Sequence, residues 1–498
     1  MKIFSTEQIR NWDAYTISHE PISSSNLMLR AATACADWIY AHWNNDTPVN
    51  VVCGNGNNGG DGLALARLLL LTGYPVKVIL GSKTQRSADN QYNLDLLLAQ
   101  YPNCILTLDK AHACPEHSIL IDALFGTGLN KKIEGEEARM ILWMNEQGRP
   151  IISIDIPSGM DGDHLNENEV AIRANHTLSF QQYKKSFLWP ESDAYCGRIH
   201  ILDIGLSQEY YHNTNSNDYL LDPEMMHQLY RPRKSFAHKG TYGHALLLAG
   251  SHGKMGAAIL SAKAILRSGA GLCSVMIPES ENDIIQSALP EAMSIPYGEL
   301  ENMPDLTKYQ SIGLGCGLGT DIHASRLLED LLHNASIPLI LDADALNILS
   351  EHPEWLALIP KGSLLTPHPK EFDRLFGPSN NSEDRMNLQL QKSKSFGLLI
   401  LLKGHHTCLS TPEGTCYFNS TGNPGMATGG SGDVLTGIIT GLFAQYHDLQ
   451  TAALIGMYLH GLAADLAAKE HSQESLIASD INDYLGKAFK LCFYTSSE

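Results

Sequence analysis

The sequence predicts an α/β protein built from two domains. Short aliphatic runs alternate with longer helical patterns along the chain, which is typical of strands and helices in turn. Several of these runs lack an alternation of apolar and polar residues, as expected for parallel strands that are covered on both faces. The chain has 498 residues, and because a domain usually has about 150, two domains of ample size are expected.

Strands and helices are predicted in both halves of the chain. In the first half, the predicted strands are residues 49–53, 76–80, 118–121, 151–154 and 198–203, with helices at 63–71 and 89–100. In the second half, the predicted strands are residues 245–249, 273–277, 311–314, 339–341, 363–366 and 398–403, with a helix at 257–267. Residues 207–218 are polar and without periodicity, which favours a linker. We therefore predict domains at residues 1–213 and 214–498.

Composition excludes several classes of function. The chain is 43% hydrophobic and 18% charged, as in ordinary globular proteins. Its 35 Lys and Arg against 54 Asp and Glu give a formal net charge of −19. Such a surface repels polyanions, so neither nucleic acid nor an anionic membrane is expected as a partner.

Cysteine spacing and the N-terminal sequence bear on the compartment. The ten cysteines contain no C-x-x-C pair, which favours reduced thiols over a zinc site or a redox dithiol. The N-terminus carries charged residues where a signal peptide needs a continuous apolar segment, and no run approaches ~18 apolar residues. A cytoplasmic protein is the expectation.

The densest motif is CGNGNNGGDG at residues 53–62, between a predicted strand and a predicted helix. Gly54, Gly56 and Gly59 match G-x-G-x-x-G, so a phosphate could approach bare backbone amides at a helix N-terminus. A dehydrogenase-type dinucleotide site also needs an acidic residue closing the second strand, and here Gly81 and Ser82 follow that strand. The alternative interpretation is a tight turn that uses glycine for its backbone freedom.

Two further loops follow predicted strands of the same half: DALFGTGLNKK at 122–132 and DIPSGMDG at 155–162. Because the carboxyl ends of parallel strands converge, Asn58, Asp122 and Ser158 could meet at one crevice. An amide, a carboxylate and a hydroxyl suit a monovalent cation better than a transition metal. Lys131 and Lys132 could meet phosphates. Asp155 is the candidate general acid or base, although each such residue could instead cap a helix or shape a turn.

The sharpest motif of the second half is NPGMATGGSGDVLTGIITG at residues 423–441. Its glycines lead into a helical run whose amides and dipole would stabilise a phosphate or a transferring phosphoryl group. Asp433 lies in the first helical turn and could remove a hydroxyl proton in phosphoryl transfer. The alternative is that Asp433 only stabilises the helix N-terminus. The sequence has no G-x-x-x-x-G-K-[ST], so a P-loop is not the nucleotide site.

Taken together, these motifs resemble those of the bifunctional NAD(P)H-hydrate repair enzymes. GNGNNGGDG, DALFGTG and DIPSGMDG resemble the epimerase half of that family, and GTYGHALLLAGS, TPHPKEF, KGHHT and NPGMATGGSGDVLTG resemble its dehydratase half. The resemblance covers essentially the whole chain. It implies a Rossmann-like three-layer domain with NAD(P)HX epimerase activity, followed by a ribokinase-like α/β domain with ADP- or ATP-dependent NAD(P)HX dehydratase activity.

The resemblance also implies a set of site residues. In the first half it implies substrate contacts by Asn57, Asn58, Gly59, Gly60, Asp61, Gly126, Thr127, Gly128, Leu129, Asn130, Lys131, Lys132 and Asp155. It assigns potassium to Asn58, Asp122 and Ser158. In the second half it implies substrate contacts by Ala257, Gly317, His368 and Asp433, and adenine-nucleotide contacts by Lys403, Gly404, His405, His406, Thr407 and Gly432. Asp155 and Asp433 are the expected catalytic residues.

The implied chemistry removes water that has added to the nicotinamide ring of NADH or NADPH. The dehydratase half would phosphorylate the C6 hydroxyl of the S epimer with ADP or ATP and Mg²⁺, Asp433 taking the proton, after which phosphate leaves. The products are NAD(P)H, phosphate and AMP or ADP. The epimerase half would interconvert the R and S epimers with Asp155 as proton carrier. The expected assembly is a homo-oligomer.

Two departures and three rival functions accompany the resemblance. The family's G-P-G loop reads Gly315-Cys316-Gly317 here, and the early segment LMLRAA lacks an acidic residue beside Arg30. The first rival is a conventional small-molecule kinase, which would release a stable phosphate ester. The second is a non-catalytic scaffold in the first half, which would usually have lost the Asp122 and Asp155 carboxylates. The third, hydride transfer with NAD, is disfavoured by the missing ribose-binding acid.

Overall fold

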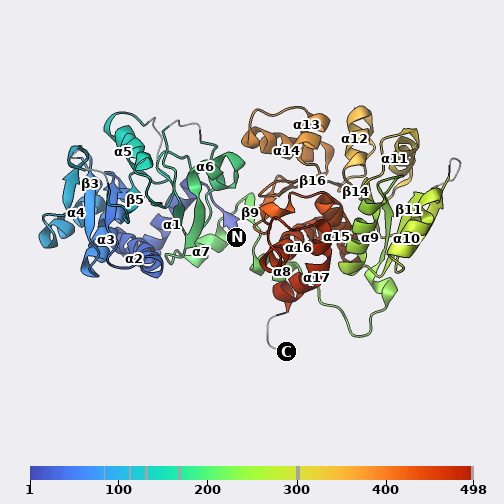
Figure 1. Cartoon of the computed structure of the whole chain (residues 1–498), viewed down its shortest axis with the longest axis horizontal. Coiled ribbons are helices and arrows are strands. Elements are labelled where there is room, and N and C mark those ends of the chain that lie inside the picture. The colour runs from blue at the N-terminus through green and yellow to red at the C-terminus, as the bar shows by residue number, and fades with distance from the viewer. Residues whose placement is uncertain (83–84, 112–113, 129–132, 167–169, 299–302, 495–498) are drawn as a thin grey trace. The chain divides into compact units, whose positions relative to one another are not determined.

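The structure is a computed structural model that describes residues 1–82, 85–111, 114–128, 133–166, 170–298 and 303–494. The chain divides into two compact units, one of Lys2–Ser216 and one of Asn217–Glu498 together with Met1 (Figure 1). We call them the N-terminal and the C-terminal unit.

The N-terminal unit contains a parallel sheet in the order β4-β3-β2-β5-β6-β7-β8. The strands of this sheet are β2 (Val49–Cys53), β3 (Val76–Leu80), β4 (Ile105–Thr107), β5 (Ile119–Ala123), β6 (Ile151–Ile154), β7 (His176–Phe180) and β8 (Arg198–Leu202). The short strand β1 (Lys2–Ile3) is not part of it. The helices of the N-terminal unit are α1 (Thr6–His19), α2 (Ser24–His42), α3 (Asn57–Leu71), α4 (Ala88–Gln100), α5 (Gly135–Glu146), α6 (Asp193–Cys196) and α7 (Gln208–Asn213).

Two apolar cores sandwich this sheet. One packs α2, α3 and α4 against one face of the strands, and the other packs α5 against the opposite face (Figure 1). The chain runs outward from β2 to β3 and β4 on one side, and from β5 to β8 on the other. The direction therefore reverses between β2 and β5, which is where ligands bind in open α/β sheets.

The C-terminal unit has a mixed sheet in the order β9-β18-β17-β16-β15-β14-β13-β10-β11-β12. Its strands are β9 (Asp218–Leu220), β10 (His244–Leu248), β11 (Leu272–Pro278), β12 (Met293–Tyr297), β13 (Ser311–Leu314), β14 (Leu339–Leu341), β15 (Leu364–Leu365), β16 (Leu399–Leu402), β17 (Cys408–Ser410) and β18 (Cys416–Phe418). Its helices are α8 (Pro223–Leu229), α9 (Met255–Arg267), α10 (Asn282–Ala288), α11 (Ile322–Asn334), α12 (Asp344–Glu351), α13 (Pro369–Phe376), α14 (Ser382–Phe396), α15 (Ser431–Tyr446), α16 (Leu449–Glu470) and α17 (Ala478–Phe493).

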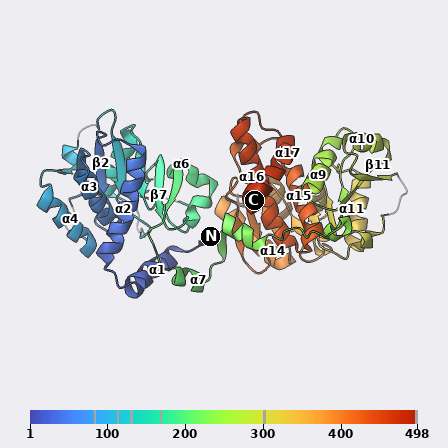
Figure 2. The ribbon, with the colours of Figure 1, turned by 90° about the horizontal axis from the view of Figure 1, so that it is seen from below.

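Helices cover both faces of this sheet as well. α9, α15, α16 and α17 pack in sequence on one face (Figure 2), and α11, α12 and α13 pack on the other. α16 is long and apolar enough to span a membrane by composition, but 78% of its most apolar window is buried inside the unit. It is therefore a core helix, and its apolarity is explained by packing.

The polar segment 207–218, predicted as a linker, contains the boundary between the two units after Ser216, but it has regular structure. It forms α7 and the start of β9, because the Ser207 side chain caps the helix on the amide of Tyr210. Tyr210 and Tyr211 then stack on Trp12 of α1, with ring centroids 6.2 and 5.6 Å apart. Two aromatic rings in a polar run were the signal that this segment packs.

All ten cysteines are free and buried. Five lie in each unit, and burial raises the pKa of the Cys53, Cys196 and Cys273 thiols among others. Desolvation disfavours the thiolate, which is the reactive form, so these thiols pack as small apolar side chains.

Candidate functional sites

A cavity of about 880 Å³ opens at the carboxyl ends of β2, β5 and β6. Its position is the reversal point of the strand order. Of the residues expected to touch substrate, Asn57, Asn58, Asp61, Gly126, Thr127, Gly128 and Asp155 line it. Gly59 and Gly60 lie buried in the first turns of α3 behind this wall. Leu129, Asn130, Lys131 and Lys132 lie outside the described residues.

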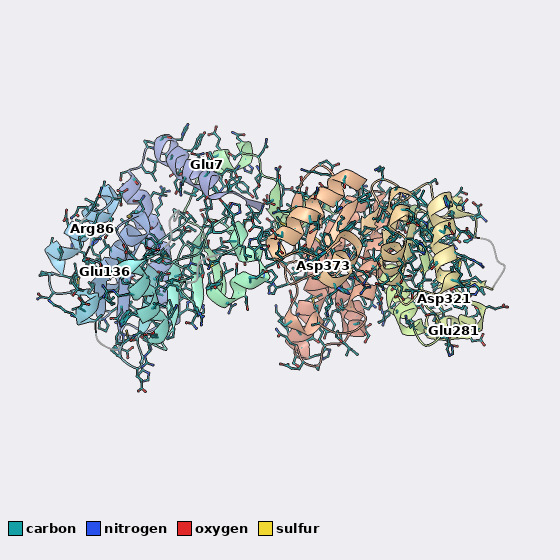
Figure 3. All side chains as sticks on the ribbon, turned by 90° about the horizontal axis from the view of Figure 1, so that it is seen from above. Glu7, Arg86, Glu136, Glu281, Asp321 and Asp373 are labelled. Atoms are coloured by element: carbon teal, nitrogen blue, oxygen red, sulfur yellow. The ribbon has the colours of Figure 1, made fainter. Side chains whose placement is uncertain are left out.

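The glycine-rich loop is held tightly against the sheet. A Cβ on Gly54 would overlap the carbonyl oxygen of Leu124, and one on Gly59 would overlap that of Gly54. Arg86, labelled in Figure 3, and Asn90 both donate hydrogen bonds to the Gly54 carbonyl. The helix begins at Asn57 rather than at the predicted residue 63, because the glycines and asparagines continue the helix instead of forming a turn. Its free N-terminal amides thus lie at the cavity.

The three residues proposed for a cation lie around the segment 124–126. Asp122 is fully buried and accepts hydrogen bonds from the Ser158 amide at 2.8 Å and the Ser158 hydroxyl at 2.6 Å. The same hydroxyl accepts from the Phe125 amide. A Cβ on Gly126 would lie 3.4 Å from the Asn58 Cβ. Burial raises the pKa of Asp122, although the hydrogen bonds from Ser158 oppose that shift.

Asn58 is the member of this group with unmet hydrogen-bonding capacity. Its side chain is buried, and neither its amide nitrogen nor its amide oxygen has a hydrogen-bond partner. A buried amide without partners costs free energy. The arrangement therefore leaves an oxygen acceptor and an NH₂ donor for a ligand at the cavity wall.

Asp155 lies at the end of β6 with a backbone φ of +66°. Its Oδ1 is 2.8 Å from the Nζ of Lys184, whose side chain is fully buried. Two more carboxyl groups from α1 and α3 share this wall. Burial and the charge of Asp155 raise the pKa of Asp13 to about 7, and burial followed by the charges of Asp155 and Asp13 raises the pKa of Asp61. The wall thus holds two carboxyl groups whose pKa values are raised by burial and by neighbouring carboxylates.

Sequence reasoning missed Asp13 and Lys184. Lys184 is a single lysine buried within a segment that contributes Phe187, Leu188 and Trp189 to the interior. A cation in such surroundings needs an anion, which was the available signal. Nothing in the sequence indicated that the anion would be Asp155, 29 residues earlier.

The second site lies at the carboxyl ends of β10, β13 and β14 and at the start of α15 in the C-terminal unit. α15 begins after Gly430, whose φ is +90°, and Asp433 is in its first turn. Burial, followed by the charge of Asp342, raises the pKa of Asp433 to about 6. A Cβ on Gly432 would lie 3.4 Å from the Nζ of Lys403. The helix start, Asp433 and Lys403 are therefore neighbours.

Asp342 organises the centre of this site, and sequence reasoning missed it. It follows β14, is buried, and accepts from Lys403 at 2.8 Å and from the Thr436 hydroxyl at 2.7 Å. Glu371 lies 3.9 Å from the same Lys403 amino group. A carboxylate directly after a buried strand was a signal for Asp342, but its partners come from β16 and α15.

The remaining predicted residues of this half take the following places. Ala257 in α9 touches Gly317, where a Cβ would lie 2.9 Å from the Ala257 Cβ. His368 caps α13, its Nδ1 accepting from the amides of Lys370 and Glu371, while its side chain stays 46% exposed. His368 thus has a structural role and is also accessible to a ligand.

The segment 403–407 forms a turn after β16. The Thr407 hydroxyl bonds the Gly404 carbonyl, and Gly404 and His405 are exposed. His406 points inward, where its Nδ1 contacts the Asn419 carbonyl and burial lowers its pKa to about 4. Lys403 is engaged with Asp342, so the exposed end of the turn is the part open to a nucleotide.

Fold and sites together define a two-domain α/β enzyme. A sequence model of the family described as "YjeF-related protein N-terminus" matches residues 24–186, and one described as "NAD(P)H-hydrate dehydratase" matches residues 245–487. A solved ribokinase-like superfamily protein from Enterococcus faecalis is 28% identical, with a TM-score of 0.51, and covers 57% of this chain and 99% of that one. The predicted Rossmann-like and ribokinase-like folds are confirmed.

Full-length relatives identify the family. A protein of Coxiella burnetii named bifunctional NAD(P)H-hydrate repair enzyme Nnr is 34% identical over 97% of this chain and 98% of its own length. A protein of the same name from Moorella thermoacetica is 33% identical over 97% and 96%. The chain belongs to the family of bifunctional NAD(P)H-hydrate repair enzymes. The ADP/ATP-dependent NAD(P)H-hydrate dehydratase of Bacillus subtilis, co-crystallised with ATP and Mg²⁺, is 34% identical with a TM-score of 0.49, covering 56% of this chain and all of that one.

Proposed function

We propose that the two sites divide the repair of hydrated nicotinamide coenzymes between them. The N-terminal unit epimerises R- and S-NAD(P)HX in the cavity beside Asp155. The C-terminal unit dehydrates the S epimer to NAD(P)H with an adenine nucleotide. The proposal rests mainly on the position of Asp433. Its partly buried carboxyl group lies in the first turn of α15, a helix that begins directly after Gly430. Family membership supports the reaction, and this geometry supports the residues that we assign to it.

Asp433 and the start of α15 perform complementary tasks in this proposal. The Asp433 carboxylate takes the proton of the C6 hydroxyl while that oxygen attacks the terminal phosphorus of the nucleotide. The amides around Gly432 stabilise the charge that develops on the transferring phosphoryl group. The C6–O bond then breaks, phosphate leaves, the ring loses a proton and its double bond returns. AMP is the second product if ADP is the donor, and ADP if it is ATP.

The nucleotide is placed against the exposed end of the turn 403–407. His368 and the contact between Ala257 and Gly317 form the substrate side. Mg²⁺ bound with the nucleotide neutralises phosphate charge, and it commonly uses one or two carboxylates together with phosphate oxygens. Asp433 in the first turn of α15 and Asp342, which accepts from Thr436 of the same helix, are carboxylates that would suit that mode.

Potassium is the proposed cation of the N-terminal unit, held by Asn58, Asp122 and Ser158. The unpartnered amide oxygen of Asn58 and the buried carboxylate of Asp122 are donors of the class that hard, weakly charged cations prefer. A bound cation supplies positive charge beside the phosphates of the substrate. Asp155 moves the proton in epimerisation, and Lys184 holds its carboxylate in place.

The test supplies full-length protein with resolved R- and S-NADHX, ADP or ATP, Mg²⁺ and K⁺, and follows NADH by absorbance and chromatography. We expect both epimers to reach NADH only when nucleotide is present. Conversion of the S epimer alone would overturn the epimerase assignment. A stable phosphate ester in place of NADH would favour a conventional kinase.

Potassium binding is tested separately on the full chain, whose thermal unfolding is compared in KCl and in tetramethylammonium chloride. We expect K⁺ to raise the unfolding temperature of the native chain, because a ligand of the folded state stabilises it. Asn58→Ala should abolish that difference. Asn57→Ala, which changes the exposed neighbouring amide, should keep it. Equal unfolding temperatures in the two salts would contradict a potassium site.

We also propose that the protein is cytoplasmic and that it forms a homo-oligomer. Ten buried free thiols suit a reducing compartment such as the cytoplasm. Phe236 has a fully exposed side chain, which suits an aromatic contact between copies of the chain in a homo-oligomer. Light scattering of native protein and of Phe236→Ser tests the second point, and a monomeric native protein would contradict it.

A further inference from the structure

A second cavity, of about 350 Å³, lies in the C-terminal unit away from both sites. It opens where α9 and α15 end, beneath the segment that joins α8 to β10. Asp433 lies in the first turn of α15, and Tyr446, which lines the cavity, is the last residue of the same helix. At 1.5 Å per residue, these two residues are separated by about 20 Å along the helix. The volume is within the range of small-molecule sites.

The charge of this cavity is opposite to that of the whole chain. Its lining includes Arg231, Arg233, Lys234 and Arg267, and no Asp or Glu belongs to the lining. Within the described ranges, none of the four cations has a carboxylate at ion-pair distance. A chain of net charge −19 therefore keeps four cations around one hollow. All four side chains are exposed, so the hollow presents clustered positive charge to solvent, and such charge attracts anions.

Aromatic rings hold two of these cations in place. The Arg233 guanidinium lies 4.0 Å from the centroid of the Tyr242 ring, and the Arg231 guanidinium lies 5.4 Å from that of Tyr446. Arg233 also donates to the Gly269 carbonyl and Arg231 to the Tyr446 carbonyl. The Arg231 bond caps the last carbonyl of α15, and the Arg233 bond reaches a carbonyl two residues past the end of α9. The planar fork of each guanidinium has five N–H donors, so one such bond does not exhaust it.

Further aromatic surface completes the wall. Tyr230 stacks on Phe493 at 4.0 Å, and the hydroxyl groups of Tyr230 and Tyr494 are 2.9 Å apart. Tyr230, Tyr494 and Phe489 line the cavity. Ring faces beside guanidinium groups provide stacking for a flat base next to donors for phosphate oxygens.

We propose that this cavity is a second ligand site and that its ligand is a nucleoside phosphate. Lys234 and Arg267 supply charge that no carboxylate of the described residues pairs with, Arg231 and Arg233 supply oriented donors, and the tyrosines supply the face for the base. The site is distinct from the nucleotide position beside residues 403–407.

The test is calorimetric titration of the full chain with uridine diphosphate, which avoids the adenine base used at the catalytic site. The pocket variant is Lys234→Gln with Arg267→Gln. The control variant is Lys263→Gln with Lys361→Gln, which removes the same charge from residues outside the cavity. We expect saturable binding that weakens by at least about tenfold in the pocket variant, the size expected for losing a charged hydrogen bond, and by less than about twofold in the control.

Inorganic pyrophosphate is titrated in parallel, and it should bind more weakly because it has no base to stack. Equal affinities would overturn the nucleoside assignment. Equal losses in the two variants, or no saturation by uridine diphosphate, would overturn the site. S-NADHX dehydration should be unchanged in both variants, so failure here is separable from failure of the proposed catalytic function.

Discussion

Asp433 and Asp155 are assigned the same task in different surroundings. Asp433 has a partly buried carboxyl group, near Asp342, which is itself paired with Lys403. Asp155 is paired directly with buried Lys184. The first arrangement raises the pKa of a carboxyl group toward the pH at which a base works, and the second fixes the position of a carboxylate.

Asp433→Asn should abolish dehydration of S-NADHX and leave epimerisation unchanged. In the native chain, kcat for dehydration should fall as pH drops through about 6, because the base must be the carboxylate and its pKa is about 6. A rate that stays constant down to pH 5 would argue against Asp433 as the base. Asp344→Asn, at the start of α12, is the control for loss of a nearby charge.

Asp433→Asn should also stabilise the folded protein, and the size of this effect should depend on pH. The folded pKa of Asp433, about 6, lies above the unfolded value of 3.8. Its contribution to stability is therefore complete below pH 3.8 and is lost as pH rises through 6. Asparagine does not ionise, so Asp433→Asn should raise the free energy of unfolding at pH 8 by up to about 3 kcal/mol and leave it unchanged near pH 3.5. Denaturant titrations at the two pH values measure the difference.

Asp155→Asn should stop epimerisation while dehydration of supplied S-NADHX continues. Asparagine is the informative substitution, because the φ of +66° at this position is one that asparagine adopts readily and alanine does not. Proton NMR of the R and S epimers follows the exchange. Retained epimerisation would remove Asp155 from its assigned role.

At the residue scale, the sequence predicted those groups that stand in a local motif. Local motifs singled out Asn58, Asp122 and Ser158, which the structure places around the segment 124–126, and Asp433, which it places at the start of α15. Lys184 and Asp342 were missed because the role of each depends on a partner in a distant segment, and no local sequence pattern specifies that pairing.

At the scale of elements, the contact between α9 and α15 depends on two glycines. A Cβ on Gly437 would overlap the Ser261 carbonyl, and one on Gly441 would overlap Ser268. The backbones of the two helices therefore approach more closely than larger residues allow. This contact fixes α15, which carries Asp433, against α9, which carries Ala257.

Gly437→Ala should destabilise the C-terminal unit by about 1–3 kcal/mol, since the added methyl group has no free space. Gly486→Ala in α17 is the control, because a Cβ there meets no atom within 4 Å. That control should stabilise by about 1 kcal/mol through helix propensity alone. Urea unfolding of both variants checks the opposite signs, and equal signs would contradict the packing argument.

Strands with apolar sequences were predicted from the sequence, whereas the strand with a polar sequence was missed. Residues 49–53, 76–80 and 151–154 are strands with the predicted bounds. β7, with the sequence HTLSF, escaped prediction because its polar side chains are buried. Thr177 bonds the Cys196 carbonyl and Ser179 the Gln182 carbonyl, so internal acceptors replace water. Composition alone does not reveal such internal acceptors.

At the scale of the whole molecule, each unit has its own sheet and its own cores. Separate cores allow separate folding. A fragment of residues 214–498 should therefore dehydrate S-NADHX with the kcat of the full chain, and a fragment of 1–213 should epimerise. Assays of the two fragments, alone and mixed, measure this. Activity only in the mixture would contradict independent units.

The buried thiols make the opening of the molecule measurable position by position. Each of the ten cysteines is buried in the folded chain, and none is more than 8% exposed. A thiol reagent can reach one only when its surroundings open, so the alkylation rate at each cysteine reports a local opening free energy. Five such reporters in each unit, read by mass spectrometry after a single reaction, would give two stability maps from one unmodified protein.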